Sequence, residues 1–249
     1  MKKILFSISD YKDNRQSIFE EHYSPQNKQY AQKHGFEYRA YKLIDTGREN
    51  LIWNKFFVAR NIVDSELNDG DILTVLDADM VVVDGSEPYQ TDKSFSYAID
   101  NGNTHCMGSY TFRINSWSRS LIEKMTDDNF YQKYKDIPLW REWAEQAAWY
   151  YLTGLPHHSW ESFLDLDNYG WHTENYGWDR FSLEELEEHV EVRGPEWNTT
   201  LLAEEADTPQ EQMLQRYNIV RSLKKDTKIR HWAGGQTWRT DPFYTRGIN

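Results

Sequence analysis

The chain has 249 residues, a net charge of −12 and one cysteine, and its length suits a single α/β domain covering residues 1–249. The negative charge argues against broad contact with nucleic acid or with anionic lipid, because both need a basic protein surface. The single cysteine, Cys106, excludes an internal disulfide and a cysteine-based zinc cage, and it fits a reducing compartment, so we expect a cytoplasmic protein.

An apolar run near the start predicts a buried first strand at 2–9, followed by a polar loop at 10–15. Ser7 interrupts the run and charged residues follow it, so it is neither a secretory signal nor a membrane span. In open α/β sheets, ligands bind beyond the carboxyl ends of the strands. We therefore expect the loop at 10–15 to contact a bound nucleotide, with Ser9 and Tyr11 as donor contacts.

Helical and strand patterns alternate along the rest of the chain. Helices are predicted at 24–35, 51–67, 118–125, 140–152, 182–189 and 209–223. Strands are predicted at 36–43, at 71–83 with an acidic break, and at 94–99, 108–114 and 228–233. Residues 157–180 show little periodicity and many aromatic and turn residues, which predicts a functional loop or lid. The alternation favours one α/β domain.

Aromatic residues make up 15% of the chain, with 11 Trp and 16 Tyr. Six of the tryptophans fall within 140–178. Aromatic rings pack against the C–H faces of sugars and against nucleobases, so this composition fits a carbohydrate site. For any one tryptophan, a place in the core or on the surface is the simpler explanation.

Two carboxylates, Asp77 and Asp79, interrupt the apolar stretch TVLDADMVVV. Charges buried in such a stretch are costly unless something pairs with them. Residues two apart in a strand point to the same side, so both carboxylates can converge on one cation. Oxygen ligands suit Mg²⁺ or Mn²⁺, which also bind diphosphate oxygens. The stretch therefore predicts a metal site.

The same string also fits the Asp-x-Asp-x-(Thr/Val) pattern of haloacid-dehalogenase-like phosphatases, with Asp77 as the nucleophile. Those enzymes place the motif on the first strand of their core domain and need a second acidic pair, commonly Gly-Asp-x-x-x-Asp. Here a strand and two predicted helices precede the motif, and no such second pair follows it. The phosphatase stays as the alternative enzyme class.

Seven segments, in their order and spacing, resemble the family 34 glycosyltransferases, the galactosyl-, mannosyl- and xylosyltransferase group, and more distantly family 8. The segments are QNKQYAQKHGFEY, WNKFFVARNIV, GDILTVLDADMVVVD, FRINSWSRSLIEKM, EQAAWYYL, VRGPEWNTT and IRHWAGGQTWR. The resemblance covers about residues 26–239. It implies a GT-A fold, which is a Rossmann-like mixed central sheet flanked by helices.

The resemblance also implies an activity. Family members transfer a hexose or pentose, with retention of the anomeric configuration, from a nucleotide sugar to a saccharide or glycan acceptor. UDP is the expected nucleotide, with GDP as the alternative. A protein that binds carbohydrate without catalysis is the non-enzymatic alternative. Eukaryotic members carry an N-terminal membrane anchor, whereas this chain starts directly at its first strand and resembles a free-standing catalytic domain.

The resemblance assigns a metal site. Asp77 and Asp79 match the family's Asp-x-Asp motif, in which Ala78 borders the donor. His231 matches the His of a late His-x-x-Gly motif and would be the third ligand of Mn²⁺ or Mg²⁺. Read without the family, a histidine at this place is more often structural than a ligand.

Further donor contacts follow from the same resemblance. Gly234 and Gly235 would let backbone N–H groups approach the diphosphate. The lysine of the family 8 pattern is missing, because Thr237 stands there, and Arg239 could supply the cation instead. Lys55, on the helix before the acidic strand, would reach the donor, as would Ser9 and Tyr11 in the first loop.

The resemblance places two catalytic residues side by side. Gln146 would lie beneath the anomeric carbon and stabilise positive charge through its carbonyl oxygen, and Glu145 would contact the donor sugar. A covalent intermediate would need a carboxylate, for which Glu145 is the candidate. The usual Asn-Ala-Gly contact to the donor sugar is replaced here by residues 106–109, CMGS, so the donor's identity stays open.

Overall fold

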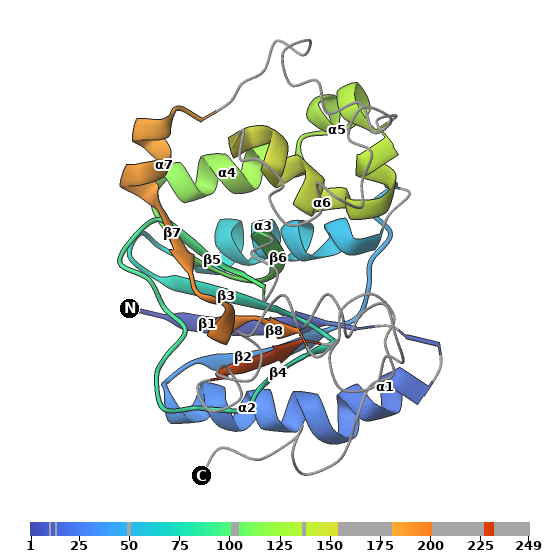
Figure 1. Cartoon of the computed structure of the whole chain (residues 1–249), viewed down its shortest axis with the longest axis vertical. Helices are drawn as coiled ribbons and strands as arrows, with labels where there is room; N and C mark the ends of the chain where they lie inside the picture. Colours follow the sequence, from blue (N-terminus) through green and yellow to red (C-terminus); the bar gives the residue numbers. More distant parts are fainter. Residues whose placement is uncertain are drawn as a thin grey trace, which may run out of the picture.

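The computed structural model describes residues 1–9, 11–12, 14–48, 51–100, 105–135, 138–153, 181–200 and 227–231. The central sheet has six strands in the order β2-β1-β3-β6-β5-β7 (Figure 1). Their bounds are β1 (Lys3–Ile8), β2 (Glu37–Tyr41), β3 (Ile72–Asp77), β5 (Phe95–Ile99), β6 (His105–Arg113) and β7 (Val190–Arg193). β1 runs parallel to β2 and β3, whereas β6 runs antiparallel to β3 and β5, so the sheet is mixed.

Helices cover both faces of this sheet (Figure 1). On one face lie α1 (Asn14–Ile18), the π-helical turn η1 (Phe19–Tyr23) and α2 (Ser24–Lys33), which follow one another directly. On the other lie the 3₁₀ turn η2 (Leu51–Trp53), α3 (Asn54–Glu66), α4 (Ser116–Thr126), α5 (Asp128–Tyr134) and α6 (Pro138–Thr153). The short helix α7 (Leu183–His189) leads directly into β7.

The first strand shows why the sheet needs helices on both sides. Ile4, Leu5 and Phe6 are completely buried. Successive side chains of a strand point to opposite faces. Ile4 and Phe6 accordingly pack into the cluster that includes α3 and α4, and Leu5 packs with Tyr30 of α2. A strand that is apolar at successive positions therefore fits an interior place in a covered sheet.

A second, smaller sheet has the order β4-β9-β8. Its strands are β4 (Met80–Val82), β8 (Thr199–Thr200) and β9 (Ile229–His231), with a 3₁₀ turn η4 (Pro195–Trp197) before β8. β9 is antiparallel to β4, with His231 opposite Met80, and parallel to β8, with His231 opposite Thr200. This pairing carries a late part of the chain to the end of β3.

The predicted mixed sheet flanked by helices is confirmed, and several boundaries differ. The first helical segment begins at Asn14, inside the predicted loop at 10–15 and ahead of the predicted start at 24. α5, β7 and β8 had not been predicted. The predicted lid at 157–180 and helix at 209–223 lie outside the described residues. Among the helices that the structure describes, none combines the length and the apolar character needed to cross a bilayer.

Candidate active site

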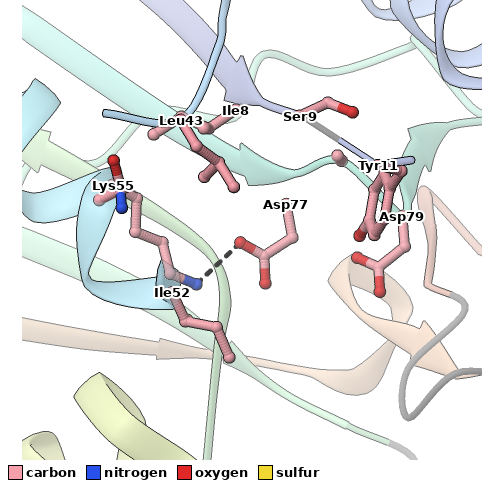
Figure 2. A pocket seen from close by; sticks show the side chains of 10 residues that line it. Ile8, Ser9, Tyr11, Leu43, Ile52, Lys55, Asp77 and Asp79 are labelled. Atoms are coloured by element: carbon pink, nitrogen blue, oxygen red, sulfur yellow. Dashed lines mark hydrogen bonds and ion pairs between the residues drawn. The ribbon is translucent and has the colours of Figure 1, made fainter. Parts of the chain in front are cut away.

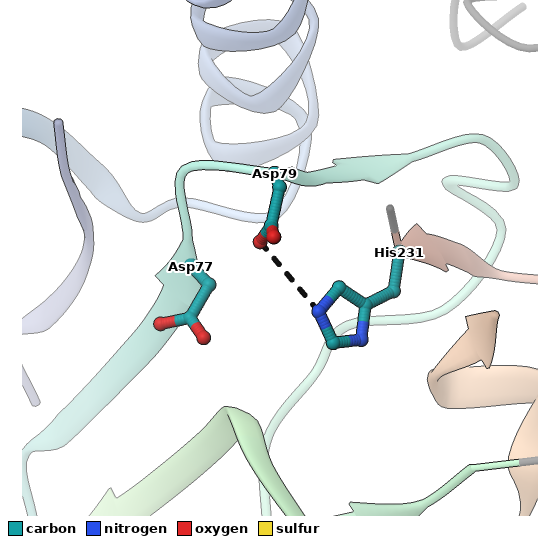
Figure 3. A group of neighbouring side chains, drawn as sticks. All are labelled: Asp77, Asp79 and His231. Carbon is teal, nitrogen blue, oxygen red and sulfur yellow. Dashed lines mark ion pairs between the residues drawn. The ribbon is translucent and has the colours of Figure 1, made fainter. Parts of the chain in front are cut away.

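Three side chains with metal-binding atoms meet where the two sheets join (Figure 3). Asp77 is the last residue of β3, Asp79 lies in the turn before β4, and His231 is the last residue of β9. One ligand atom from each residue lies within 4.8 Å of the other two. The acidic break in the predicted strand is thus a two-residue turn, and it directs both carboxylates toward the same place as the imidazole.

The imidazole of His231 is held between two partners. Its Nδ1 lies 2.9 Å from Oδ1 of Asn198, and its Nε2 lies 3.6 Å from Oδ1 of Asp79. Burial lowers the pKa of His231 to about 4, against an opposing effect of the charge on Asp77. The ring is therefore neutral at pH 7, which is the state in which histidine binds a metal ion.

The chemistry of this group fits a divalent cation. Oδ1 of Asp79 is buried and has no hydrogen-bond partner among the described residues, a costly arrangement unless a cation completes it. Burial raises the pKa of Asp79 to about 6, and the charges of Lys55 and Arg15 oppose that rise. Two carboxylates and a neutral imidazole form a ligand set suited to Mn²⁺.

Gly108 on β6 keeps the space behind this group open. A Cβ added at Gly108 would lie 2.6 Å from the terminal methyl of Met80, 3.2 Å from Oδ2 of Asp77 and 3.3 Å from Cε1 of His231. Any larger residue here would displace side chains of the cluster. Residue 108 therefore has a steric reason to be glycine.

Lys55 is buried at the centre of an ionic network. Its Nζ donates to Oδ1 of Asp77 at 2.8 Å and to the backbone oxygen of Met107 at 2.7 Å, and it lies 2.8 Å from Oε1 of Glu145. Figure 2 shows the pairing with Asp77. The side chains of Lys55 and Glu145 are only 5% and 4% exposed. Burial alone would lower the pKa of Lys55, but Asp77 and Glu145 outweigh it and raise that pKa well above its usual value.

A pocket of about 290 Å³ opens beside the carboxylates (Figure 2). It lies beyond the carboxyl ends of the parallel strands β1 and β3, the usual place for a ligand in such sheets. The residues that line it are Ile8, Ser9, Tyr11, Leu43, Ile52, Asn54, Lys55, Asp77, Ala78 and Asp79. The five predicted donor contacts that fall within the described residues are thus all brought to one pocket.

The first loop is fixed by its own hydrogen bonds. Oε1 of Gln16 accepts from the Ser9 hydroxyl at 2.7 Å and from the Tyr11 backbone N–H at 3.0 Å. The guanidinium of Arg15 lies 4.4 Å from the centre of the Tyr11 ring. A cation is therefore positioned next to the pocket, at the end of the loop that the sequence had indicated as a nucleotide contact.

A break in α6 orients the two predicted catalytic residues. Ala144 has φ 45° and ψ −117°, so the helix is interrupted immediately before Glu145. Oε1 of Glu145 reaches Lys55, and its Oε2 is buried without a hydrogen-bond partner among the described residues. Oε1 of Gln146 accepts from the Met107 N–H at 3.1 Å. Glu145 thus faces Lys55, and Gln146 faces β6.

Some of the site lies beyond what the sequence had indicated, and some beyond what the structure describes. Gly234, Gly235 and Arg239 fall outside the described residues. Asn198 had no predicted role, and Arg15 had one only as part of the loop at 10–15. Asn198 lies in one of the segments that carry the resemblance, VRGPEWNTT, and this was the only sequence signal for it.

No family profile and no curated protein sequence matches the chain. Among solved structures, it is similar over 95% of both chains to a glycosyltransferase involved in glycosylation of the major capsid of PBCV-1, with a TM-score of 0.54 and 10% identity. It is also similar to the galactosyltransferase LgtC, solved with donor and acceptor sugar analogues, at a TM-score of 0.44 and 14% identity over 96% of this chain and 90% of that one.

A third similar structure is mouse xyloside xylosyltransferase 1, at a TM-score of 0.41 and 8% identity over 95% of this chain and 99% of that one. Of these three structures, the capsid glycosyltransferase is similar enough to show a shared fold. The predicted GT-A fold is thereby confirmed, and at 10% identity the likeness shows the fold alone.

Proposed function

We propose that this chain is a metal-dependent, retaining glycosyltransferase of the family 34 type. It would transfer a hexose or pentose from a nucleotide sugar, UDP-linked rather than GDP-linked, to a saccharide acceptor. The observation that carries the proposal is the cluster of Asp77, Asp79 and His231 beside a pocket at the carboxyl ends of β1 and β3. The fold supports the same conclusion, because glycosyltransferases share it.

The charges around the pocket favour a divalent cation. Asp77, Asp79 and Glu145 bring three carboxylates together, Lys55 brings one ammonium, and His231 is neutral. Two negative charges are left over, which a divalent cation would balance. Mn²⁺ or Mg²⁺ held by Asp77, Asp79 and His231 would neutralise the charge that develops on the departing diphosphate.

The pocket has the composition expected of a nucleoside site. Ile8, Leu43 and Ile52 supply apolar surface for a base, and Ser9 and Asn54 supply polar groups for a ribose. Tyr11 and Ala78 border the same space, and Arg15 would attract phosphate oxygens. Gly234, Gly235 and Arg239 stay as proposed contacts to the diphosphate.

Retention requires the acceptor hydroxyl to arrive on the face from which the diphosphate leaves. The bond from the anomeric carbon to phosphate oxygen breaks, a bond to the acceptor oxygen forms, and the acceptor proton passes to the departing phosphate. Gln146 would stabilise positive charge on the sugar through the second lone pair of Oε1, because Met107 uses the first. Glu145 would contact the donor sugar, and its buried Oε2 is open to a sugar hydroxyl.

The test is a thermal-shift measurement with UDP, GDP, CMP and ADP, each with Mn²⁺ and with a chelator. We expect UDP with Mn²⁺ to stabilise the protein by about 2.7 kcal/mol at one hundred times its dissociation constant. Asp79→Asn should abolish this effect, and Asp64→Asn, at an exposed position on α3, should preserve it.

Two results would contradict the proposal. Stabilisation by no nucleotide, with sugar binding that ignores the metal, would indicate a carbohydrate-binding protein without catalysis. Release of phosphate from phosphomonoesters, abolished by Asp77→Asn, would indicate a phosphatase. Transfer assays with UDP-galactose, UDP-glucose and UDP-xylose then identify the sugar.

A further inference from the structure

His231 has a second partner that the metal site does not account for. The side chain of Asn198 is completely buried, and its Oδ1 lies 2.9 Å from Nδ1 of His231, which is itself 6% exposed. The other ring nitrogen, Nε2, is directed at Asp79 (Figure 3). The two nitrogens of one ring therefore face an amide on one side and a carboxylate on the other.

A neutral imidazole has one N–H and one bare nitrogen, and its partners decide which is which. An amide oxygen can only accept a hydrogen bond, so its place beside Nδ1 puts the proton on Nδ1. The lone pair of Nε2 then points toward Asp79 and Asp77. With the amide reversed, its NH₂ would donate to Nδ1, and Nε2–H would donate to Asp79 and close the site to a cation.

The position of Asn198 is fixed by its neighbours. The ring of Trp197 stacks on Tyr89 at 4.9 Å and 17°, and the charged groups of Arg193 and Lys228 lie 4.7 and 4.8 Å from its centre. The Trp197 carbonyl accepts from the hydroxyl of Ser109 at 3.3 Å. The backbone on the N-terminal side of Asn198 is thus held before β8 begins.

The backbone of Asn198 and of the residues after it is held as well. The N–H of Asn198 donates to the Pro195 carbonyl at 3.0 Å. Strand β8 follows directly and pairs with β9, the strand that carries His231. The amide and the imidazole are therefore placed by neighbouring strands of one sheet. Packing of this kind fixes the relative position of the two groups without help from a ligand.

We propose that Asn198 is a positioning residue that keeps the proton of His231 on Nδ1 and so leaves Nε2 free to bind the divalent cation. This inference rests on the metal site proposed above. Partners of this kind behind a metal-binding histidine are typically worth about 10- to 100-fold in metal affinity. We therefore expect Asn198→Ala to weaken Mn²⁺ binding by about that factor.

The substitution Asn198→Asp tests whether residue 198 accepts a hydrogen bond from Nδ1 of His231 or donates one to it. An aspartate oxygen can accept from Nδ1–H in place of the amide oxygen. Asn198→Asp should therefore keep Mn²⁺ affinity at or above the wild-type value, while Asn198→Ala loses it. Asn61→Ala, at an exposed position on α3, is the matched control and should bind like wild type. Free Mn²⁺ is measured by electron paramagnetic resonance.

A second measurement reads the tautomer without any metal. Long-range ¹⁵N–¹H spectra of the histidine-labelled protein distinguish a protonated Nδ1 from a protonated Nε2, and His231→Gln identifies the relevant signals. We expect Nδ1–H in the wild-type protein and in Asn198→Asp, and a mixture of tautomers in Asn198→Ala. A wild-type ring protonated on Nε2 would overturn the inference.

The outcomes separate this inference from the proposed function. Wild-type protein that fails to bind Mn²⁺ would overturn the metal site itself. If the wild-type protein binds Mn²⁺ and Asn198→Ala binds it equally well, the role of Asn198 is overturned and the metal site is not.

Discussion

Lys55 uses all three N–H groups of its ammonium inside the protein, on Asp77, Glu145 and the Met107 carbonyl. The sequence had indicated a contact from Lys55 to the donor. The contacts favour a different role, in which Lys55 holds two carboxylates in fixed positions: that of Asp77, a proposed metal ligand, and that of Glu145, a proposed sugar contact. Pattern analysis could not separate these roles, because both put a lysine on the helix before the acidic strand.

Lys55→Met should lower the free energy of unfolding by about 3–5 kcal/mol, because it leaves two carboxylates without their buried partner. Glu145→Gln in the same background should recover part of that loss. Chemical denaturation measures both values, and Lys33→Met, an exposed lysine on α2, is the control and should change little. If Lys55→Met were as stable as that control, the ion pairs would contribute nothing to folding.

Gln146 makes the sharpest prediction about catalysis. If its carbonyl oxygen acts on the transition state, Gln146→Ala should lower kcat by about 100- to 1000-fold and leave donor affinity nearly unchanged. Single-turnover rates and equilibrium binding of the donor measure the two quantities separately. Gln32→Ala on the exposed side of α2 should change neither. An unaltered kcat would remove Gln146 from the mechanism.

The proposed metal ligands could be predicted from the sequence, whereas the residues that position them could not. Asp77 and Asp79 stand out because charge interrupts an apolar strand, and His231 needed the family resemblance as well. Asn198 carries no comparable signal, because one buried amide gives no periodicity and acts only on a residue distant in sequence. The same holds for Gly108, whose lack of a Cβ matters only once Met80 and His231 lie against it.

Elements with regular burial were predicted well, and short or exposed ones were not. β1 and β3 are mostly apolar and are buried along nearly their whole length, so the sequence indicates them directly. β7 is half-buried or exposed at every position, and β8 has only two residues, so neither forms an apolar pattern. The start at Asn14 was missed because Pro25 suggests a first turn at 24, whereas a π-helical turn continues the earlier helix into it.

One carboxylate ties the end of α3 to β2 and to the residue before β1, and these contacts lead to a prediction about pH. Glu66 accepts from Arg39 at 2.7 and 2.8 Å and from Lys2 at 2.6 Å. These bonds, from Arg39 first and then Lys2, lower the pKa of Glu66 from 4.5 to about 2. A lowered carboxylate pKa stabilises the fold above the unfolded-state value, and this stabilisation is lost as the pH falls toward the folded-state value.

Glu66→Gln should therefore be less stable than wild type at pH 7, with a difference that shrinks between pH 4.5 and about 2. The effect should be small and should decrease in high salt, because the group is at the surface. Urea unfolding across this pH range measures it, with Glu123→Gln on the exposed face of α4 as the control. A difference that grew toward low pH would contradict the assignment.

At the scale of the whole molecule, the proposed metal site lies outside the largest hydrophobic cluster of the described residues. This cluster joins the central sheet to α3, α4 and α6, whereas the three proposed ligand residues lie at the ends of β3 and β9 and in the turn before β4. Folding should therefore not require the metal, in contrast to small zinc domains that unfold without it. The fold class could be predicted for the same reason, because it depends on apolar strands and helices rather than on the site.

Chelator should leave the far-ultraviolet circular dichroism and the cooperative thermal transition intact. Saturating Mn²⁺ alone should then raise the melting temperature by roughly 5–10 °C, if it reaches about one hundred times its dissociation constant. Calorimetry with and without chelator measures this, and His231→Gln should remove the rise. Loss of the cooperative transition in chelator would mean that the metal is part of the core structure.

The place of β9 in the middle of the small sheet has a consequence for biosynthesis. Domains emerge from the ribosome N-terminus first, and β1, β2, β3, β5 and β6 can pair with one another while later residues are still being made. β4 and β8 both wait for β9, their common neighbour, before their ladder can close. The proposed cation site is then completed only when β9 brings in His231, so a nascent chain that ends before β9 would have the central sheet without the third proposed ligand.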